Sequence, residues 1–277
     1  MRRYGIFALV IVAVVYLAFR LFAHSSALME PAVITPSMDA HHVLAPTLDA
    51  RLYRLTHERR EADRAGRPRL IALTFDDGPY AVTTPLLLDV LNDLRVRATF
   101  FLIGRDAELQ PELTRRIVSE GFEVANHTYT HPRLDIAPAK RVVEELVNGR
   151  RALRAFTNAK TISEEWRPPH GRYTEATITT AQRLGYTTVL WNDDPGDYRR
   201  YATPQMLRAH IAAHASAPEI LLLHSGVLPT IEMLPSVVAE FRAQGYTFVT
   251  VSELFAHTPL EEINHPERIT LTQGGGK

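Results

Sequence analysis

Short apolar runs alternate with amphipathic stretches between residues 69 and 255. The first run, Leu70–Leu73, has no polar break, which is typical of a strand buried on both faces of a sheet. The segments interpreted as strands are Leu70–Phe75, Ala98–Ile103, Glu123–Ala125, Glu165–Arg167, Thr187–Trp191, Ile220–Leu223 and Phe248–Val251, and Glu165–Arg167 has the weakest pattern.

Apolar residues between these runs recur every three or four positions, which is the spacing of an amphipathic helix. The predicted helices are Leu86–Leu94, Glu108–Ser119, Lys140–Phe156, Thr177–Leu184, Pro204–His214 and Pro229–Gln244. Gly121, Gly185 and Gly245 each follow a predicted helix, where a left-handed cap favours glycine. About seven β–α units in sequence predict an α/β fold with a parallel sheet and outer helices, whose chemistry lies at the carboxyl ends of the strands.

The amino-terminal segment 1–23 begins with Met and two arginines and is apolar from Gly5 to Phe19. This stretch of about 15 residues is shorter than the roughly 20 that cross a bilayer, but Arg20 can snorkel and extend it to Ala23. A cleaved signal peptide and an uncleaved membrane-spanning anchor are both compatible with the pattern, and the lack of an Ala-x-Ala site favours the anchor. Either one predicts export, with the rest of the chain anchored outside the cytoplasm or secreted.

The chain after this segment divides into three predicted parts. Residues 24–68 are interpreted as a linker with a short charged helix, and residues 69–257 as the folded domain. Residues 258–277 have no strong pattern and are predicted to be a mobile tail.

Composition narrows the class of protein. Lys plus Arg and Asp plus Glu both total 31, so the formal net charge is zero, which argues against a nucleic-acid partner. The chain has no cysteine, which excludes disulfides and thiolate metal sites. Its 12 histidines leave His, Asp and Glu as candidate metal ligands.

Asp76 and Asp77 follow the first predicted strand, where adjacent like charges are costly unless a cation, a metal or a shifted pKa neutralises one. The alternative is a solvated loop with one Asp capping the helix near Thr83. His127 and His131 follow the third strand and would face the same side of a helix. A carboxylate and two imidazoles form the layout of a catalytic metal site, with the other carboxylate free as a general base.

Three further segments end at the same predicted rim. Arg167 precedes two prolines, which stiffen the loop and favour a positioned backbone N–H. Segment 191–198 supplies acidic groups and aromatic walls. His224 closes the sixth strand and is a candidate general acid, with its other ring nitrogen held by an acid from loop 194–197.

Five motifs resemble, in order, those of the polysaccharide deacetylases, the NodB-homology family also called carbohydrate esterase family four. They are Thr74-Phe75-Asp76-Asp77-Gly78, His127-Thr128-Tyr129-Thr130-His131, Arg167-Pro168-Pro169-His170-Gly171, Asp194-Pro195-Gly196-Asp197-Tyr198 and Leu222-Leu223-His224. The resemblance implies a distorted (β/α) barrel for residues 69–257. It also implies removal of N-acetyl groups from amino sugars with a divalent metal, usually zinc, with cobalt, nickel or manganese as other candidates.

The same resemblance implies a role for each candidate residue. Asp77, His127 and His131 would be metal ligands, Asp76 the general base restrained by Arg167, and His224 the general acid oriented by Asp197. The backbone N–H of His170 would stabilise the oxyanion, and His170, Tyr198, Trp191 and Leu222 would form the substrate wall. The expected partners are an N-acetylated glycan and, through the amino-terminal helix, a membrane, and we expect a monomer.

Three positions depart from the usual motifs. His170 stands where Tyr is frequent, Tyr198 where Trp is frequent, and Ser225 where Asp is frequent. No catalytic group is lost, so these differences bear on the substrate more than on activity. Two alternatives stay open: a catalytically silent glycan-binding module, and a deacylase acting on another amide or an O-acetyl ester.

Overall fold

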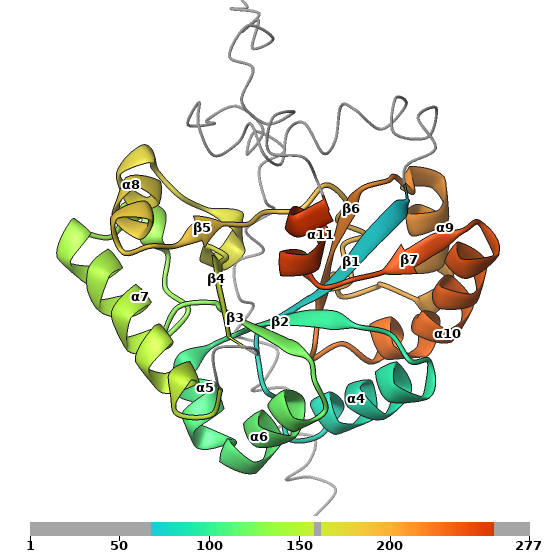
Figure 1. Ribbon diagram of the computed structural model, residues 1–277, viewed down its shortest axis with the longest axis horizontal. Helices are drawn as coiled ribbons and strands as arrows, with labels where there is room; N and C mark the ends of the chain where they lie inside the picture. Colours follow the sequence, from blue (N-terminus) through green and yellow to red (C-terminus); the bar gives the residue numbers. More distant parts are fainter. Residues whose placement is uncertain (1–67, 158–161, 258–277) are drawn as a thin grey trace, which may run out of the picture. The chain divides into compact units, whose positions relative to one another are not determined.

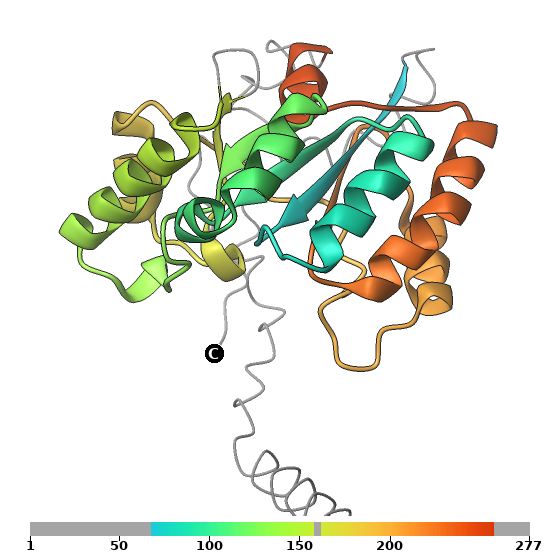
Figure 2. The ribbon, with the colours of Figure 1, turned by 90° about the horizontal axis from the view of Figure 1, so that it is seen from below.

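The computed structural model describes residues 68–157 and 162–257, so the predictions for residues 1–67 and 258–277 lie outside it. A curled sheet of seven parallel strands has the order β5-β4-β3-β2-β1-β6, and β7 pairs with the start of β1. The helices lie around the outside of this sheet, apart from α11 (Figures 1 and 2). This arrangement confirms the predicted α/β class.

The element bounds match most of the predicted segments. The strands are β1 (Arg69–Asp76), β2 (Ala98–Leu102), β3 (Glu123–Asn126), β4 (Ile162–Trp166), β5 (Thr187–Thr188), β6 (Glu219–His224) and β7 (Tyr246–Phe248). The α-helices are α4 (Thr83–Asp93), α5 (Gly104–Leu109), α6 (Pro111–Ser119), α7 (Ala139–Arg154), α8 (Glu175–Arg183), α9 (Pro204–His214), α10 (Leu228–Ala243) and α11 (Val251–His257), and the 3-10 turns are η3 (Leu134–Ile136) and η4 (Pro169–Gly171).

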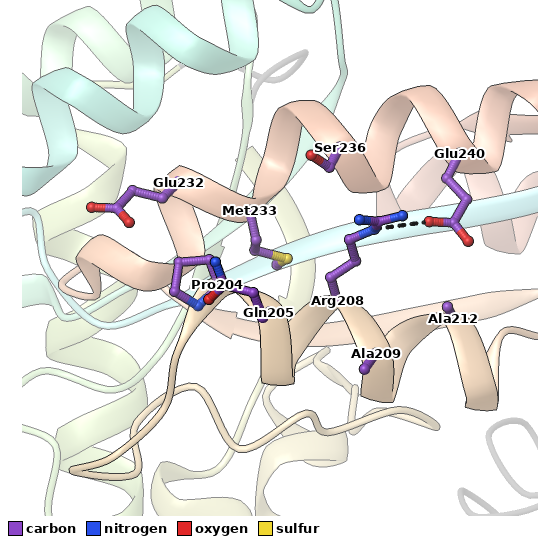
Figure 3. Close-up of a pocket in the computed structure, with 9 residues that line it drawn as sticks. All are labelled: Pro204, Gln205, Arg208, Ala209, Ala212, Glu232, Met233, Ser236 and Glu240. Carbon is purple, nitrogen blue, oxygen red and sulfur yellow. Dashed lines mark hydrogen bonds and ion pairs between the residues drawn. The ribbon is translucent and has the colours of Figure 1, made fainter.

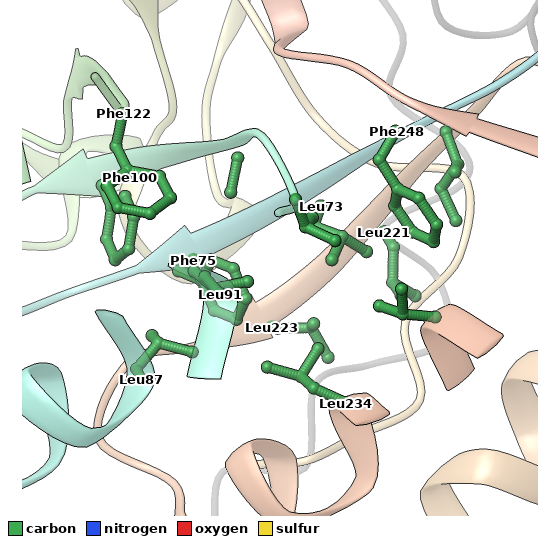
Figure 4. Close-up of a cluster of buried hydrophobic side chains, with 14 of the residues drawn as sticks. Leu73, Phe75, Leu87, Leu91, Phe100, Phe122, Leu221, Leu223, Leu234 and Phe248 are labelled. Carbon is green, nitrogen blue, oxygen red and sulfur yellow. The ribbon is translucent and has the colours of Figure 1, made fainter. Parts of the chain in front are cut away.

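The strand β1 is buried on both faces, as its apolar run predicts. Leu73 and Phe75 belong to the large core between the sheet and its outer helices, which Figure 4 shows around Leu91 of α4. Ala72 belongs to a second core on the opposite face, where it is clustered with Leu254 of α11. Because side chains alternate along a strand, Thr74 and Asp76 share the face of Ala72, so the polar end of β1 opens onto the inside of the curl.

Residues 189–193 link the two edges of the curled sheet. The N–H of Val189 donates to the carbonyl of Trp166 (2.9 Å), and the N–H of Leu222 donates to the carbonyl of Asp193 (3.0 Å). This irregular segment therefore lies between β4 and β6, which fits the predicted distorted barrel. It also explains why the predicted strand Thr187–Trp191 is regular only at Thr187–Thr188.

Two predicted elements were wrong in part. The single helix Glu108–Ser119 is two helices, because Pro111 has no N–H to continue α5 and instead begins α6. The strand Phe248–Val251 ends at Phe248, and α11 begins at Val251.

Every helix within residues 68–157 and 162–257 is too short or too polar to span a membrane. The predicted membrane helix at residues 1–23 lies outside the described residues.

Candidate active site

Four strands end at the candidate site. Their last residues are Asp76 of β1, Asn126 of β3, Trp166 of β4 and His224 of β6. Asp76 is paired in register with His224, and Asn126 with Trp166. Since the carboxyl ends of parallel strands lie at one edge of the barrel, the residues that follow them converge there.

Arg167, the residue after β4, holds the carboxylate of Asp76. Its guanidinium donates to Oδ1 of Asp76 at 2.6 Å and to the hydroxyl of Thr74 at 2.9 Å. It also donates to the carbonyls of Val189 (3.2 Å) and Leu190 (3.1 Å). Arg167 is fully buried, so its position is set by these bonds and not by solvent.

Burial raises the pKa of Asp76 above its ordinary value, and the positive charge of Arg167 opposes this rise. In its ionised form, a carboxylate whose pKa is raised is a stronger base than an ordinary carboxylate. The second oxygen, Oδ2, is not bonded to Arg167 and lies 3.7 Å from Nε2 of His127. Asp76 is therefore held at one oxygen and available at the other.

Asp77, His127 and His131 form a cluster whose ligand atoms all lie within 4.8 Å of one another. Oδ1 of Asp77 is 3.3 Å from Nε2 of His131 and 3.7 Å from Nε2 of His127. This oxygen is buried but has no hydrogen-bond partner. A buried acceptor without a donor between two imidazole nitrogens fits a divalent cation, because such ions take His nitrogen and carboxylate oxygen as ligands.

The tautomer of His127 also suits a metal ligand. Its Nδ1 is 2.9 Å from the carbonyl of Arg167, so Nδ1 carries the proton and Nε2 presents a lone pair toward Asp77. Burial, reinforced by the neighbouring His131, lowers the pKa of His127 to about 3. The imidazole is therefore neutral near pH 7, as metal binding requires.

The two histidines converge although the segment that carries them is not helical. Residues 127–131 form a loop in which Thr128 (φ 68°) and His131 (φ 58°) both lie in the left-handed region. The N–H of Thr128 donates to Oδ1 of Asn126 (2.9 Å), and the N–H of His131 donates to the hydroxyl of Thr128 (3.1 Å). A tight turn therefore brings the two imidazoles together, where the spacing alone would have required a helix.

Asp77 does not cap the following helix. The residue before α4 is Val82, which makes no side-chain cap, and Asp77 itself has φ 68°. This left-handed backbone turns Asp77 away from the alternation of β1, so the adjacent carboxylates have different neighbours: Arg167 for Asp76 and the two imidazoles for Asp77.

His224 faces this cluster from β6 and is held by Asp197. Its Nδ1 lies 2.7 Å from Oδ1 of Asp197. Burial disfavours the imidazolium, but the hydrogen bond and charge of Asp197, with Asp76 and Asp77, raise the pKa of His224 to about 9. His224 is therefore mainly protonated near neutral pH and can give up a proton.

Aromatic rings border these groups. The ring of Tyr198 lies edge-on to His224 at 5.4 Å, and His170 lies edge-on to His131 at 4.5 Å. Trp191 packs so closely on Gly171 that a Cβ there would lie 2.5 Å from its ring, and it also lies 5.6 Å from the Arg167 guanidinium.

Comparison with known proteins places this arrangement in a family. The family model described as polysaccharide deacetylase matches residues 63–189. A peptidoglycan-N-acetylglucosamine deacetylase of Bacillus cereus is 34% identical over 194 residues, which covers 68% of this chain and 89% of that protein. The chain belongs to the polysaccharide deacetylase family. The predicted family and its enzyme class, polysaccharide deacetylase, are thereby confirmed.

Two further relatives show the range of the family. A chitooligosaccharide deacetylase of a Bradyrhizobium species is 41% identical over 161 residues, covering 58% of this chain and 73% of that protein. A mutant of the Bacillus anthracis protein BA3943, described as a CE4 family pseudoenzyme with restored enzymatic activity, shares the fold with a TM-score of 0.64 and 29% identity. That alignment covers 68% of this chain and 67% of the mutant.

The predicted site residues of this deacetylase fall into two groups by position. The predicted metal ligands, base, acid and their holding residues lie in one connected set of contacts. They are Asp76, Asp77, His127, His131, Arg167, His224 and Asp197. Of the predicted wall residues, Tyr198 is exposed, whereas Leu222 is only 3% exposed and offers little surface to a ligand.

Two residues of the polysaccharide deacetylase site were missed. Thr74 accepts a bond from Arg167, and Thr230 donates to Oδ2 of Asp197 at 2.7 Å. Thr74 could have been noticed, because it is a polar residue on the inward face of an otherwise apolar strand. Thr230 had no such signal, since it comes from α10.

A surface cavity of about 390 Å³ lies elsewhere, between α9 and α10 (Figure 3). Its lining includes Met233 and the ion pair of Arg208 with Glu240 (3.2 Å). None of the candidate site residues lines it.

Proposed function

We propose that this chain is a metal-dependent hydrolase that removes N-acetyl groups from amino sugars of a cell-envelope or extracellular polysaccharide. Peptidoglycan, a chitin-like polymer and an acetylated exopolysaccharide are the candidate substrates. Residues 69–257 form the catalytic domain in this proposal, and export places that domain outside the cytoplasm.

One observation carries the proposal: three ligand-type side chains meet beside a separately held acid and base. The cluster of Asp77, His127 and His131 lies next to Asp76, whose partner is Arg167. These three residues would hold the divalent metal, with zinc as the first candidate because of its affinity for imidazole and carboxylate. The metal would supply Lewis-acid polarisation of the acetyl carbonyl.

Asp76 is the proposed general base. Its free oxygen takes a proton from the attacking water, and Arg167 keeps the carboxylate oriented through the other oxygen. The water oxygen forms a bond to the acetyl carbon, and negative charge develops on the carbonyl oxygen. We assign the backbone N–H of His170 as a donor to that oxygen.

His224 is the proposed general acid. The carbon–nitrogen bond breaks as His224 gives its proton to the leaving amine, so the products are acetate and a free amino sugar. Asp197 keeps Nδ1 occupied and stabilises the imidazolium, so the proton is delivered from Nε2. The raised pKa of Asp76 makes its carboxylate a stronger base, and the raised pKa of His224 keeps the acid protonated, which suits this division of roles.

The relatives support the substrate class. The Bacillus cereus protein acts on peptidoglycan N-acetylglucosamine and the Bradyrhizobium protein on chitooligosaccharides, according to their names. Both are N-acetylated glycans, so an N-acetylated glycan is the substrate class proposed for this chain. The exposed Tyr198 beside His224 would provide an apolar face for a sugar ring.

A catalytically silent glycan-binding module is a real alternative, because BA3943 is described as a pseudoenzyme of this family. Such a module need not keep a base, an acid and three metal ligands in contact. All of them are present and connected here, which favours an enzyme.

Acetate release tests the proposal. The full chain, loaded with zinc, is incubated with chitooligosaccharides, peptidoglycan and acetylated exopolysaccharide fragments, with and without a chelator. We expect release from at least one N-acetylated glycan that stops with the chelator and returns with metal. The variant Asp76→Asn should still bind glycan but lose turnover. Absence of release from every glycan with metal restored would rule out the proposed activity.

A further inference from the structure

The loop between the two histidines has a backbone that needs support. Thr128 and His131 both have positive φ, and a β-branched residue such as Thr rarely adopts this conformation. Residues in such conformations persist only where their surroundings enforce them. The path of residues 129–130, between these two positions, therefore depends on contacts from outside the loop.

Glu145 of α7 makes these contacts. Its Oε2 accepts hydrogen bonds from the backbone N–H groups of Tyr129 (2.9 Å) and Thr130 (2.7 Å). Its Oε1 accepts from the hydroxyl of Thr130 (2.7 Å) and is 2.6 Å from Nη2 of Arg141. One carboxylate therefore binds the middle of the histidine loop at three points.

The position of Glu145 within α7 is unusual for an acidic residue. It is 1% exposed and lies on the buried side of the helix with Val142 and Leu146. A buried carboxylate is costly unless donors surround it, and here most of the donors come from the histidine loop. The neighbouring Glu144 is only partly buried and approaches Lys140 and Arg141 at the surface, at 3.9 and 3.8 Å.

Other contacts hold the loop at different atoms. The N–H groups of Gly104 and Arg105 at the start of α5 donate to the carbonyls of Thr128 (2.9 Å) and Tyr129 (3.0 Å). Glu145 instead takes the N–H groups of residues 129 and 130, immediately before His131. Its loss leaves those donors without their acceptor and frees the backbone that aims His131.

We infer that Glu145 is a positioning residue of the metal site, which sets the spacing of His127 and His131 through the backbone between them. This inference rests on the proposed function, because it assumes that the two histidines bind a metal. It predicts that Glu145 controls metal affinity although it touches neither the metal nor the substrate.

Metal affinity of the full chain tests the inference. Zinc dissociation constants are measured by competition with a chromophoric chelator for wild type, Glu145→Gln and the matched control Glu144→Gln. Residues that orient metal ligands typically change affinity by about 10- to 100-fold, so we expect a loss of that size for Glu145→Gln and none for Glu144→Gln. The visible spectrum of bound Co²⁺ should change only in Glu145→Gln, which reports ligand geometry and not stability.

The outcomes separate the two proposals. If wild type binds no metal, the proposed function fails. If wild type binds metal and a folded Glu145→Gln binds it equally well with the same Co²⁺ spectrum, the role of Glu145 is overturned. Should Glu145→Gln fail to fold by circular dichroism, Thr130→Val decides, because it removes one of the bonds to Glu145 without altering a charge. A severalfold weaker affinity in Thr130→Val supports the inference, and an unchanged affinity overturns it.

Discussion

The carboxylate of Asp197 binds His224 at two points. Oδ1 lies 2.7 Å from the ring Nδ1, and Oδ2 accepts the backbone N–H of the same residue at 2.7 Å. Thr230 donates to Oδ2 as well, and Asp197 is 2% exposed. The pair is therefore rigid and poorly screened by solvent, so the protonation of His224 is linked to the stability of the fold.

This linkage predicts a pH-dependent stability. The folded-state pKa of His224 is about 9, while the pKa of an unfolded histidine is about 6.5. Since the folded value is higher, His224 stabilises the fold fully below about pH 6.5, and this contribution is lost as the pH rises through about 9. In metal-free protein, the difference in unfolding free energy between wild type and His224→Gln should shrink by roughly 3 kcal/mol from about pH 6 to about pH 10.

Urea unfolding in chelator at both pH values measures this difference. Groups that do not interact with His224 cancel between wild type and variant, so the change reports His224 together with the carboxylates around it. A difference that stays constant with pH would contradict the ion pair with Asp197.

Replacing Asp197 by Asn should shift the activity profile. The variant keeps a hydrogen-bonding side chain but removes the charge that raises the pKa of His224. The acid form is then lost at lower pH, so the alkaline limb of kcat should move down by about one pH unit or more, and kcat near neutrality should fall about 10- to 100-fold. KM should change little. A pH–rate profile over acetate release provides the measurement, and an unmoved alkaline limb would argue that His224 is not the acid.

Local patterns were sufficient for elements whose ends carry their own signals. The helix Pro204–His214 was predicted to the residue from its apolar spacing, and in the structure Thr203 caps it and Pro204 occupies its first turn. A comparable signal at α11 was overlooked: Thr250 and Glu253 exchange backbone and side-chain bonds in a capping box. Val249 and Val251 extend the apolar run of β7 because they fill the inside of the barrel, so the run resembles a longer strand.

The candidate site was predictable in its members and not in its geometry. Asp76 and Asp77 could be assigned to a strand end, but their different neighbours depend on the left-handed backbone of Asp77. The turn between His127 and His131 is shaped by contacts from α5 and α7, such as the bonds of Glu145, which no local pattern encodes. Hydrogen bonds from distant segments therefore set the geometry of the site residues, which the motifs alone do not specify.

Truncating Arg167 should destabilise the protein strongly. The variant Arg167→Met leaves Asp76 buried without its cation, and breaking one side of a buried ion pair typically costs about 3–5 kcal/mol. The companion change Asp76→Asn should recover part of this loss, because it removes the unpaired charge. Chemical denaturation of the two single variants and the double variant in chelator gives the coupling. If the loss of unfolding free energy in the double variant equals the sum of the two single losses, a direct interaction between Asp76 and Arg167 is contradicted.

Removal of the metal should reverse the stability order of wild type and Asp77→Asn. Without metal, Oδ1 of Asp77 is a buried acceptor with no donor, and His127 is too weakly basic to neutralise it. Asp77→Asn removes this unpaired charge, so in chelator it should be at least as stable as wild type. With zinc at about 100 times its dissociation constant, wild type should gain about 2.7 kcal/mol and the variant almost nothing.

Thermal unfolding with and without zinc tests both parts of this prediction. A variant that gains as much from zinc as wild type would exclude Asp77 as a ligand, and a variant less stable than wild type in chelator would assign Asp77 a structural role instead.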